Sequence, residues 1–170
     1  MIDLIFSNHT NDRTPGKEFF KKVLETATRE IKKLRNKEIE RLRHLSVSVN
    51  LVGESKIKAL NKKYRHKNKS TDVLAFPLKK DLEIRNLKLE IDKDIGDVFV
   101  CLSIAKKEAT RENISINKKL TQLTAHGFLH LLGYDHERSK RSAEEMFELE
   151  DTILSRLESF LKPQTLSSKL

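Results

Sequence analysis

Cysteine is almost absent from this 170-residue chain, because Cys101 is its only one. A single cysteine excludes an internal disulfide and a cysteine-rich zinc site. Long apolar runs are missing too, since no window approaches the roughly 18 apolar residues of a membrane-spanning helix. The N-terminal stretch MIDLIFSNHTNDR lacks the basic start and the apolar length of a signal peptide. We therefore expect a cytoplasmic protein without membrane association.

Acidic residues are too few to balance the basic ones. The 34 Lys and Arg against 25 Asp and Glu give a net charge of +9 and a pI near 9.6. An excess of this size on a small protein indicates a polyanionic partner. With 37% hydrophobic and 35% charged residues, the chain is expected to form a single domain over residues 1–161, with a flexible tail over residues 162–170.

Hydrophobic periodicity predicts strands that alternate with helices. The clearest strand signal is LSVSVNLV at residues 45–52, in which every second residue is apolar. Further strands are expected at residues 2–6, 70–77 and 96–104, and a weak irregular or edge segment at 79–91. Helices are expected at about 15–35, 54–65, 104–112, 117–132 and 139–161. This order predicts an α/β (α+β) fold with a single mixed sheet packed against helices.

Three of the six histidines stand in HGFLHLLGYDH, at residues 126–136. His126 and His130 lie one helical turn apart, so both side chains can bind one ion from the same helix face. On a continuing helix His136 would point about 240° away from His130. Gly133 resolves this, because a glycine just past a helix end readily takes the left-handed conformation that ends the helix. The spacing therefore predicts a metal site.

Three neutral imidazoles suit a divalent transition metal, most commonly zinc, although nickel and copper also accept such ligands. Three protein ligands leave a position open for water, which is typical of a catalytic site rather than a structural one. Binding to zinc lowers the pKa of that water to about 7.

Gly127 separates this motif from the metzincin proteases, whose H-E-x-x-H-x-x-G-x-x-H has the same spacing. Those enzymes carry their general-base glutamate at the position of Gly127. Without that base the motif still favours a metal hydrolase but argues against a peptidase. Glycine inside a helix costs about 1 kcal/mol relative to alanine, so close approach of the substrate or of a neighbouring strand is expected there.

A basic run suggests what the metal acts on. Seven Lys and Arg residues stand between positions 56 and 69 with no acidic residue among them: Lys56, Lys58, Lys62, Lys63, Arg65, Lys67 and Lys69. Such a run suits contacts with phosphate groups. Arg65 differs from the lysines because its planar fork can hold a phosphate through two hydrogen bonds.

Three segments together resemble the YbeY family of metal-dependent bacterial endoribonucleases. They are HGFLHLLGYDH, NKKYRHKNKSTDVLAFP at residues 61–77 and IGDVFV at residues 95–100. The resemblance runs from residue 45 to about 155, and Glu145, Met146 and Glu150 also follow the family pattern. Asn68, Ser70 and Ala75 depart from it, where aspartate, proline and serine are usual. These departures bear on the shape of the substrate channel and not on the metal site.

The resemblance implies a zincin-like domain with a sheet of about four strands flanked by helices. It implies His126, His130 and His136 as ligands, most commonly of one zinc ion, and Arg65 as the channel residue needed for cleavage. The implied function is cleavage of single-stranded RNA in 16S ribosomal RNA 3′-end maturation and ribosome quality control. The ribosome or small-subunit assembly proteins would be partners.

Two other functions stay open at this point. One is a metzincin-like metallopeptidase, and the other is a non-catalytic, metal-binding ribosome-assembly factor. The general base of a nuclease reaction is not assigned. Asp135 either orients a ligand histidine or caps the turn after Gly133. Asp72 and Asp97 are expected at strand starts as turn or cap residues, and Cys101 is expected in the core.

Overall fold

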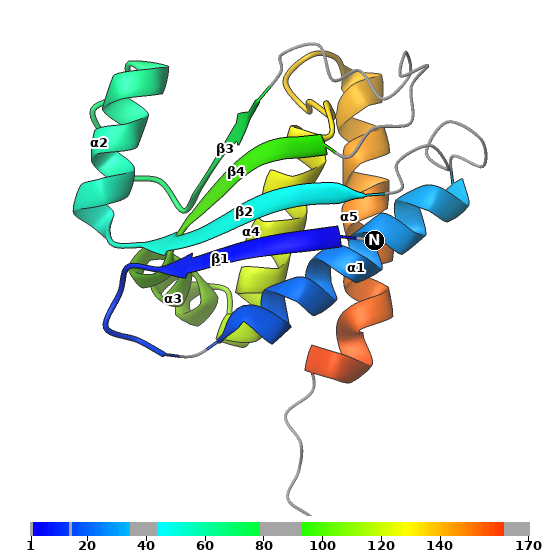
Figure 1. Ribbon diagram of the computed structural model, residues 1–170, viewed down its shortest axis with the longest axis horizontal. Coiled ribbons are helices and arrows are strands. Elements are labelled where there is room, and N and C mark those ends of the chain that lie inside the picture. The colour runs from blue at the N-terminus through cyan, green and yellow to red at the C-terminus, as the bar shows by residue number, and fades with distance from the viewer. Residues whose placement is uncertain (1, 14, 35–43, 79–92, 162–170) are drawn as a thin grey trace, which may run out of the picture.

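Four strands and five helices make up the described part of the chain, which covers residues 2–13, 15–34, 44–78 and 93–161 of this computed structural model (Figure 1). The strands are β1 (Ile2–Asn8), β2 (Leu45–Val52), β3 (Val73–Pro77) and β4 (Lys93–Cys101). The helices are α1 (Lys17–Leu34), α2 (Glu54–Arg65), α3 (Leu102–Arg111), α4 (Ile116–Leu131) and α5 (Lys140–Leu161). None of these helices is both long and apolar enough to cross a membrane.

The strands form one mixed sheet in the order β1-β2-β4-β3. The pairs β1–β2 and β2–β4 are parallel, whereas β3 runs antiparallel to β4. The predicted α/β fold with a single mixed sheet of about four strands is confirmed. This order leaves β3 at one edge of the sheet, where only β4 pairs with it among the described strands.

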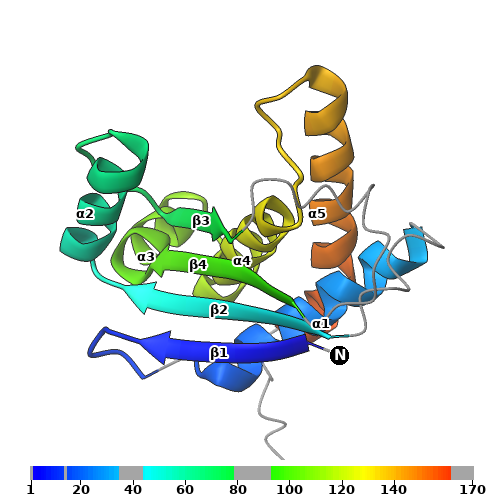
Figure 2. The same cartoon turned by 45° about the horizontal axis from the view of Figure 1, so that its top comes forward.

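The main core lies between one face of the sheet and the helices α1, α4 and α5 (Figures 1 and 2). The alternating apolar residues of β2, which are Leu45, Val47, Val49 and Leu51, are all at most 2% exposed. A second, smaller cluster of Val52, Ile57, Leu74 and Cys101 joins α2 to β3 and β4. Cys101 is buried, as predicted. The position of α2 is thus fixed by apolar contacts at the β3 edge of the sheet.

Residues 93–104 differ from the prediction. Asp97 does not start a strand but lies inside β4, opposite Phe76. The strand begins earlier, at Lys93, and crosses an irregularity around Gly96, whose φ of +126° excludes most side chains. The glycine and aspartate that were expected to form a turn before the strand therefore lie at a bulge within a longer strand. Helix α3 likewise begins at Leu102, before the expected position.

Two predictions fall outside the described residues. They are the weak segment at residues 79–91 and the flexible tail at residues 162–170. The prediction of one domain over residues 1–161 stays a prediction.

Candidate metal centre

The end of α4 brings the third histidine back toward the first two. Gly133 has a φ of +88°, so it takes the left-handed conformation expected of it. Its N–H donates to the His130 carbonyl at 3.0 Å, and the Tyr134 N–H donates to the Leu129 carbonyl at 3.1 Å. This pair of bonds is the Schellman motif, which ends a helix and reverses the chain. His136 follows three residues later and returns to the same side of α4.

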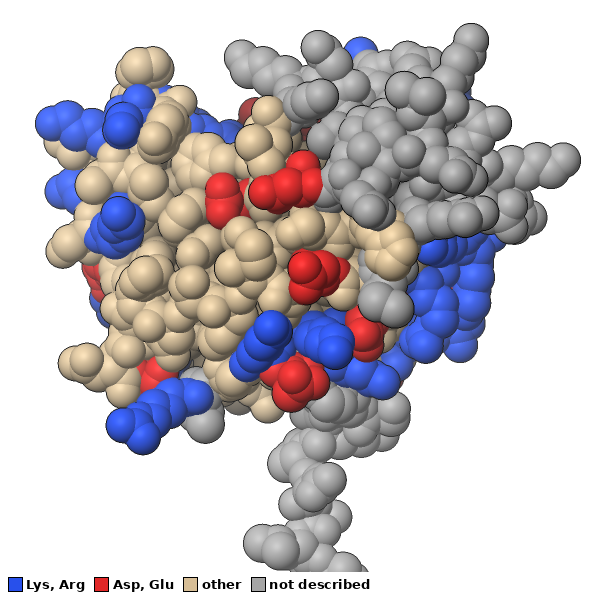
Figure 3. Space-filling model, viewed as in Figure 1, with Lys and Arg blue, Asp and Glu red and all other residues tan. Residues whose placement is uncertain are grey.

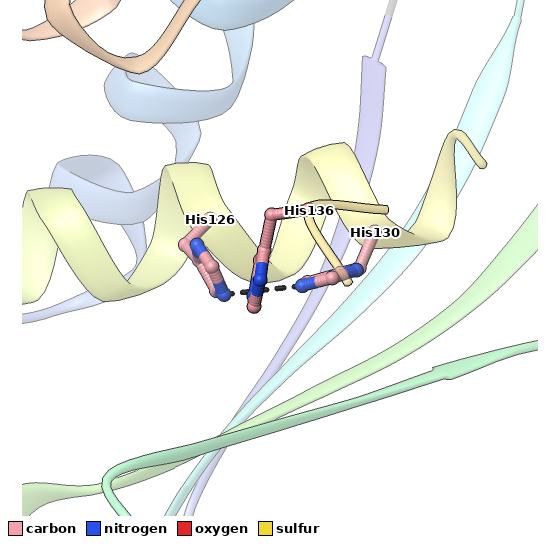
Figure 4. Close-up of side chains that lie close together, drawn as sticks. All are labelled: His126, His130 and His136. Atoms are coloured by element: carbon pink, nitrogen blue, oxygen red, sulfur yellow. Dashed lines mark hydrogen bonds between the residues drawn. The ribbon is translucent and has the colours of Figure 1, made fainter. Parts of the chain in front are cut away.

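The three histidine side chains converge on one point (Figure 4). One ring nitrogen from each of His126, His130 and His136 lies within 4.8 Å of the other two. The Nε2 atoms of His126 and His130 are 3.1 Å apart. Around a tetrahedral zinc ion with zinc–nitrogen distances of 2.0–2.1 Å, the ligand nitrogen atoms lie about 3.3 Å from one another. The predicted histidines are therefore brought together at a spacing that fits one metal ion after small side-chain adjustments.

The protonation of the cluster also fits a metal. Glu150 Oε1 lies 2.6 Å from His126 Nδ1. With a proton on Nδ1, His126 donates to this carboxylate and turns the Nε2 lone pair toward the other histidines. Burial, followed by the nearby His126 and His136, lowers the pKa of His130 to about 4. His130 is therefore neutral at pH 7, as a metal ligand must be.

Gly127 packs closely against the sheet. A Cβ atom at this position would stand 2.7 Å from Val98 Cγ1 and 3.5 Å from Val73 Cγ2. Of the two causes expected for this glycine, close approach of a neighbouring strand therefore accounts for it. A glutamate here would have to displace the side chain of the fully buried Val98, so this packing disfavours the general base of a metzincin.

A cleft of about 500 Å³ opens beside the histidines. Figure 2 shows α2 and the N-terminal half of α5 standing on either side of β3 and α4. Its lining includes His126, His130, His136 and Glu150, which we call the histidine wall. It also includes Arg65, Lys67 and Lys69, from the end of α2 and the loop after it, which we call the basic wall. The structure thus brings Arg65 into the same cleft as the three histidines.

The basic wall is held in place by a few polar bonds. Helix α2 ends at His66, which has a left-handed φ of 57°. The buried Asn61 donates through its side-chain amide to the Lys69 carbonyl at 2.8 Å, which fixes the loop that follows. Arg65 is exposed, and its Nη2 donates to the Ala75 carbonyl at 3.4 Å. Figure 3 shows lysine and arginine side chains gathered at the edge of the molecule over α2.

The aspartates near the cleft accept hydrogen bonds from backbone N–H groups. Asp72 Oδ1 accepts from the Val73 N–H at 2.9 Å, which agrees with the predicted cap. Asp135 Oδ1 accepts from the Glu137 N–H at 2.9 Å, so of its two alternatives the structure has the turn cap. At the bulge around Gly96, the capping residue is Asp94 and not Asp97, because Asp94 Oδ1 accepts from the Gly96 N–H at 3.1 Å.

Glu150 was missed as a functional residue by the sequence analysis. It stands 24 residues after His126 and on a different helix, so no local spacing connects the two. The only sequence signal was that Glu150 follows the family pattern. Its contact with His126 depends on the packing of α5 against α4.

The family can be decided by comparison with known proteins. The sequence model of the family described as Endoribonuclease YbeY matches residues 6–158. The chain belongs to this family. The match includes all three histidines, Arg65 and Glu150, and it agrees with the resemblance found in the motifs.

Individual relatives give the same assignment. The chain is 34% identical to the endoribonuclease YbeY of Persephonella marina over 165 residues, which cover 97% of this chain and 99% of that protein. It is 36% identical to the endoribonuclease YbeY of Buchnera aphidicola, with 99% of this chain and 97% of that protein covered. The solution structure of a Thermotoga maritima protein, 26% identical, matches the fold with a TM-score of 0.55, over 99% of this chain and 100% of that one.

Proposed function

We propose that this endoribonuclease cleaves single-stranded ribosomal RNA with one zinc ion held by His126, His130 and His136 and with Arg65 as a catalytic residue. The observation that carries the proposal is the cleft itself. Its histidine wall can hold a divalent ion, and its basic wall offers positive charge to a phosphate bound in the same cleft.

Each wall has its own part in the proposed reaction. A bound divalent ion would supply Lewis-acid polarisation of the scissile phosphate. Glu150 holds the His126 ring through the Nδ1 contact and so fixes the direction of its Nε2 lone pair. Arg65 would place its guanidinium on the non-bridging oxygens, where charge develops during cleavage. Lys67 and Lys69 would hold the neighbouring phosphates of the strand.

The size of the cleft favours an unpaired substrate. A volume of about 500 Å³ is on the scale that accommodates a drug-sized molecule, which corresponds to one or two nucleotides. Unpaired bases of a single strand can be splayed into a cleft of this size, whereas bases stacked and paired in a duplex cannot. We therefore keep single-strand specificity as part of the proposal.

The peptidase alternative loses support at Gly127. Peptide hydrolysis at a metal centre of this spacing needs a carboxylate base at that position, and Val98 occupies the space next to it. A neutral peptide also offers no negative charge for the basic wall to bind. No specific observation favours the non-catalytic assembly factor over the enzyme.

The cellular setting follows from the proposed substrate. We propose maturation of the 3′ end of 16S ribosomal RNA and ribosome quality control, with the ribosome or small-subunit assembly proteins as partners, in the cytoplasm. The positive charge of +9 supports a polyanionic partner of this kind.

A cleavage assay tests the proposal. The zinc-loaded protein is incubated with a labelled single-stranded RNA, with the same RNA annealed to its complement, and with casein. We expect cleavage of the single strand, sparing of the duplex and casein, and loss of cleavage in His130→Ala but not in Lys58→Ala, an exposed lysine of the same basic run. Casein cleavage that disappears in His130→Ala, with the RNA left intact, would overturn the proposal in favour of the peptidase.

The ends of the RNA products identify the attacking group. A 2′,3′-cyclic phosphate indicates attack by the 2′-hydroxyl of the RNA, whereas a 5′-phosphate on the downstream product indicates attack by water. Both outcomes fit the cleft, and they decide whether a general base must be sought near the sugar or near a water molecule.

A further inference from the structure

Phe147 lies beside the metal centre with half of its side chain exposed. It projects from α5, where Met146, Leu149 and Ile153 are buried, but Phe147 itself is 50% exposed. A single exposed apolar side chain is common on protein surfaces and needs no explanation by itself. What distinguishes Phe147 is its neighbour: its ring stacks on the His136 ring, with centroids 6.1 Å apart and planes 18° apart.

Helix α5 contacts two of the three histidines through residues one turn apart. Glu150 contacts His126. Phe147 lies three positions earlier on the same helix face, and its ring contacts the His136 ring. The aromatic ring therefore lies beside His136, just outside the set of residues that line the cleft. In RNA a base is joined to its phosphate by one ribose, so a base that flanks the bound phosphate is within reach of this ring.

We propose that Phe147 stacks on an unpaired base adjacent to the scissile phosphate. The inference rests on the proposed function and adds to it a residue that recognises the substrate. Aromatic side chains in single-strand binding proteins stack on bases of any identity, because every base has a π-face. A base inside a duplex is already stacked and paired, so a stacking contact beside the metal would favour single-stranded RNA without imposing a sequence.

A purely structural part for Phe147 makes a different prediction. If the ring only packs against His136, its removal loosens a metal ligand and lowers the metal content. The loss of activity would then be the same for every RNA. If the ring stacks on a base, its removal leaves the metal in place, and the effect disappears when that base is absent from the RNA.

The test uses zinc-loaded full-length protein and a fluorescein-labelled single-stranded RNA whose cleavage site has been mapped with the unsubstituted protein. Versions of the RNA carry one abasic residue on either side of that site. Phe147→Ala removes the ring and Phe147→Tyr keeps it. Ile5→Ala is the matched control, because Ile5 is 53% exposed on β1 and lies outside both walls of the cleft. Zinc content, dissociation constant, KM and kcat are measured for each protein.

We expect Phe147→Ala to raise KM and the dissociation constant for intact RNA by about 5- to 150-fold, the range of one base–aromatic stack. Its kcat and zinc content should stay near those of the unsubstituted protein. Phe147→Tyr and Ile5→Ala should behave as the unsubstituted protein. On RNA with the flanking abasic residue, the unsubstituted protein and Phe147→Ala should become equal.

Unchanged binding of intact RNA by Phe147→Ala overturns the inference. So does a loss of zinc, or a loss of affinity that is the same for intact and abasic RNA. If the unsubstituted protein binds RNA without cleaving it, the proposed function fails. The inference about Phe147 is then tested with RNAs that carry a single abasic residue at successive positions. It holds if the dissociation constants of the unsubstituted protein and of Phe147→Ala become equal at one of these positions. If it binds no RNA, both fail.

Discussion

The histidine wall rests on buried positions of the core, whereas the basic wall consists of exposed side chains held by few bonds. His126 and His130 project from α4, whose neighbouring residues Phe128, Leu129 and Leu131 are fully buried. Arg65 and the lysines after it are exposed and depend on Asn61 and on the end of α2 for their position. In the proposed function, one wall holds an ion in a fixed geometry, and the other meets a polymer whose phosphates vary in position.

This difference predicts that substitutions in the two walls have different effects on the protein. Changes in the basic wall should alter turnover on RNA while metal binding and stability stay the same. Changes in the histidine wall should alter the metal first. Changes behind the histidine wall should alter stability alone.

The largest effect is expected at Arg65. Removal of a group that stabilises transition-state charge costs about 10²- to 10³-fold in kcat, so Arg65→Ala should lose that much RNA cleavage. Its zinc content and melting temperature should be unchanged, because the side chain is exposed and makes one long hydrogen bond of 3.4 Å. Arg65→Lys should recover only part of the rate, since lysine lacks the planar fork. Lys58→Ala, on the same helix, is the control.

A loss of zinc in Arg65→Ala would contradict the separation of the two walls. So would a kcat within a few-fold of the unsubstituted protein, which would remove Arg65 from the reaction.

The next effect concerns Glu150. Substitution of a group that orients a ligand histidine typically costs about 10- to 100-fold in metal affinity, and we expect this range for Glu150→Gln. Cleavage should return toward the unsubstituted rate when zinc is saturating, because the ligands themselves are intact. Zinc affinity is measured by competition with a chelating dye, and Glu148→Gln, exposed on the same helix, is the control. Equal zinc affinity in both variants would show that the His126–Glu150 contact has no part in holding the metal.

The smallest effect is expected behind the histidines, at Gly127. An added methyl group would crowd Val98 at 2.7 Å, and overpacking of a core costs about 1–3 kcal/mol. The better helix propensity of alanine offsets about 1 kcal/mol of this. We expect Gly127→Ala to lower the melting temperature by up to about 8 °C, with RNA cleavage kept within a few-fold at 25 °C.

A second substitution makes this expectation specific. In a Val98→Ala background the space for the methyl group is open, so Gly127→Ala should become stabilising. A melting temperature that falls equally in both backgrounds would show that contact with Val98 is not the reason for the glycine.

The two walls also differ in how far the sequence could predict them. The His126–His130 spacing and the left-handed Gly133 are local features, so the metal centre followed from eleven consecutive residues. Arg65 was chosen for its chemistry and its motif, but its place across the cleft depends on contacts of α2 with β3 and β4, which no local pattern reveals. Glu150 and Phe147 reach the histidines only because α5 packs on α4.

One question that the sequence left open and one wrong expectation have the same origin. Gly127 had two possible causes, and only the packing of α4 on Val98 decides between them. Asp97 was expected at a strand start because it follows a glycine. That glycine, Gly96, forms a bulge that depends on pairing with β2 and β3, strands far away in the sequence.

Removal and return of the metal tests the central claim most directly, namely that the histidine centre is catalytic for RNA and not a structural element. The protein is stripped with a chelator, then reloaded with zinc, and single-strand RNA cleavage is followed beside a circular-dichroism melting curve. We predict that the stripped protein keeps its fold and a cooperative melting transition, loses cleavage by about 1000-fold or more, and regains it with one equivalent of zinc. Unfolding of the stripped protein, or cleavage at the same rate without metal, would contradict the account.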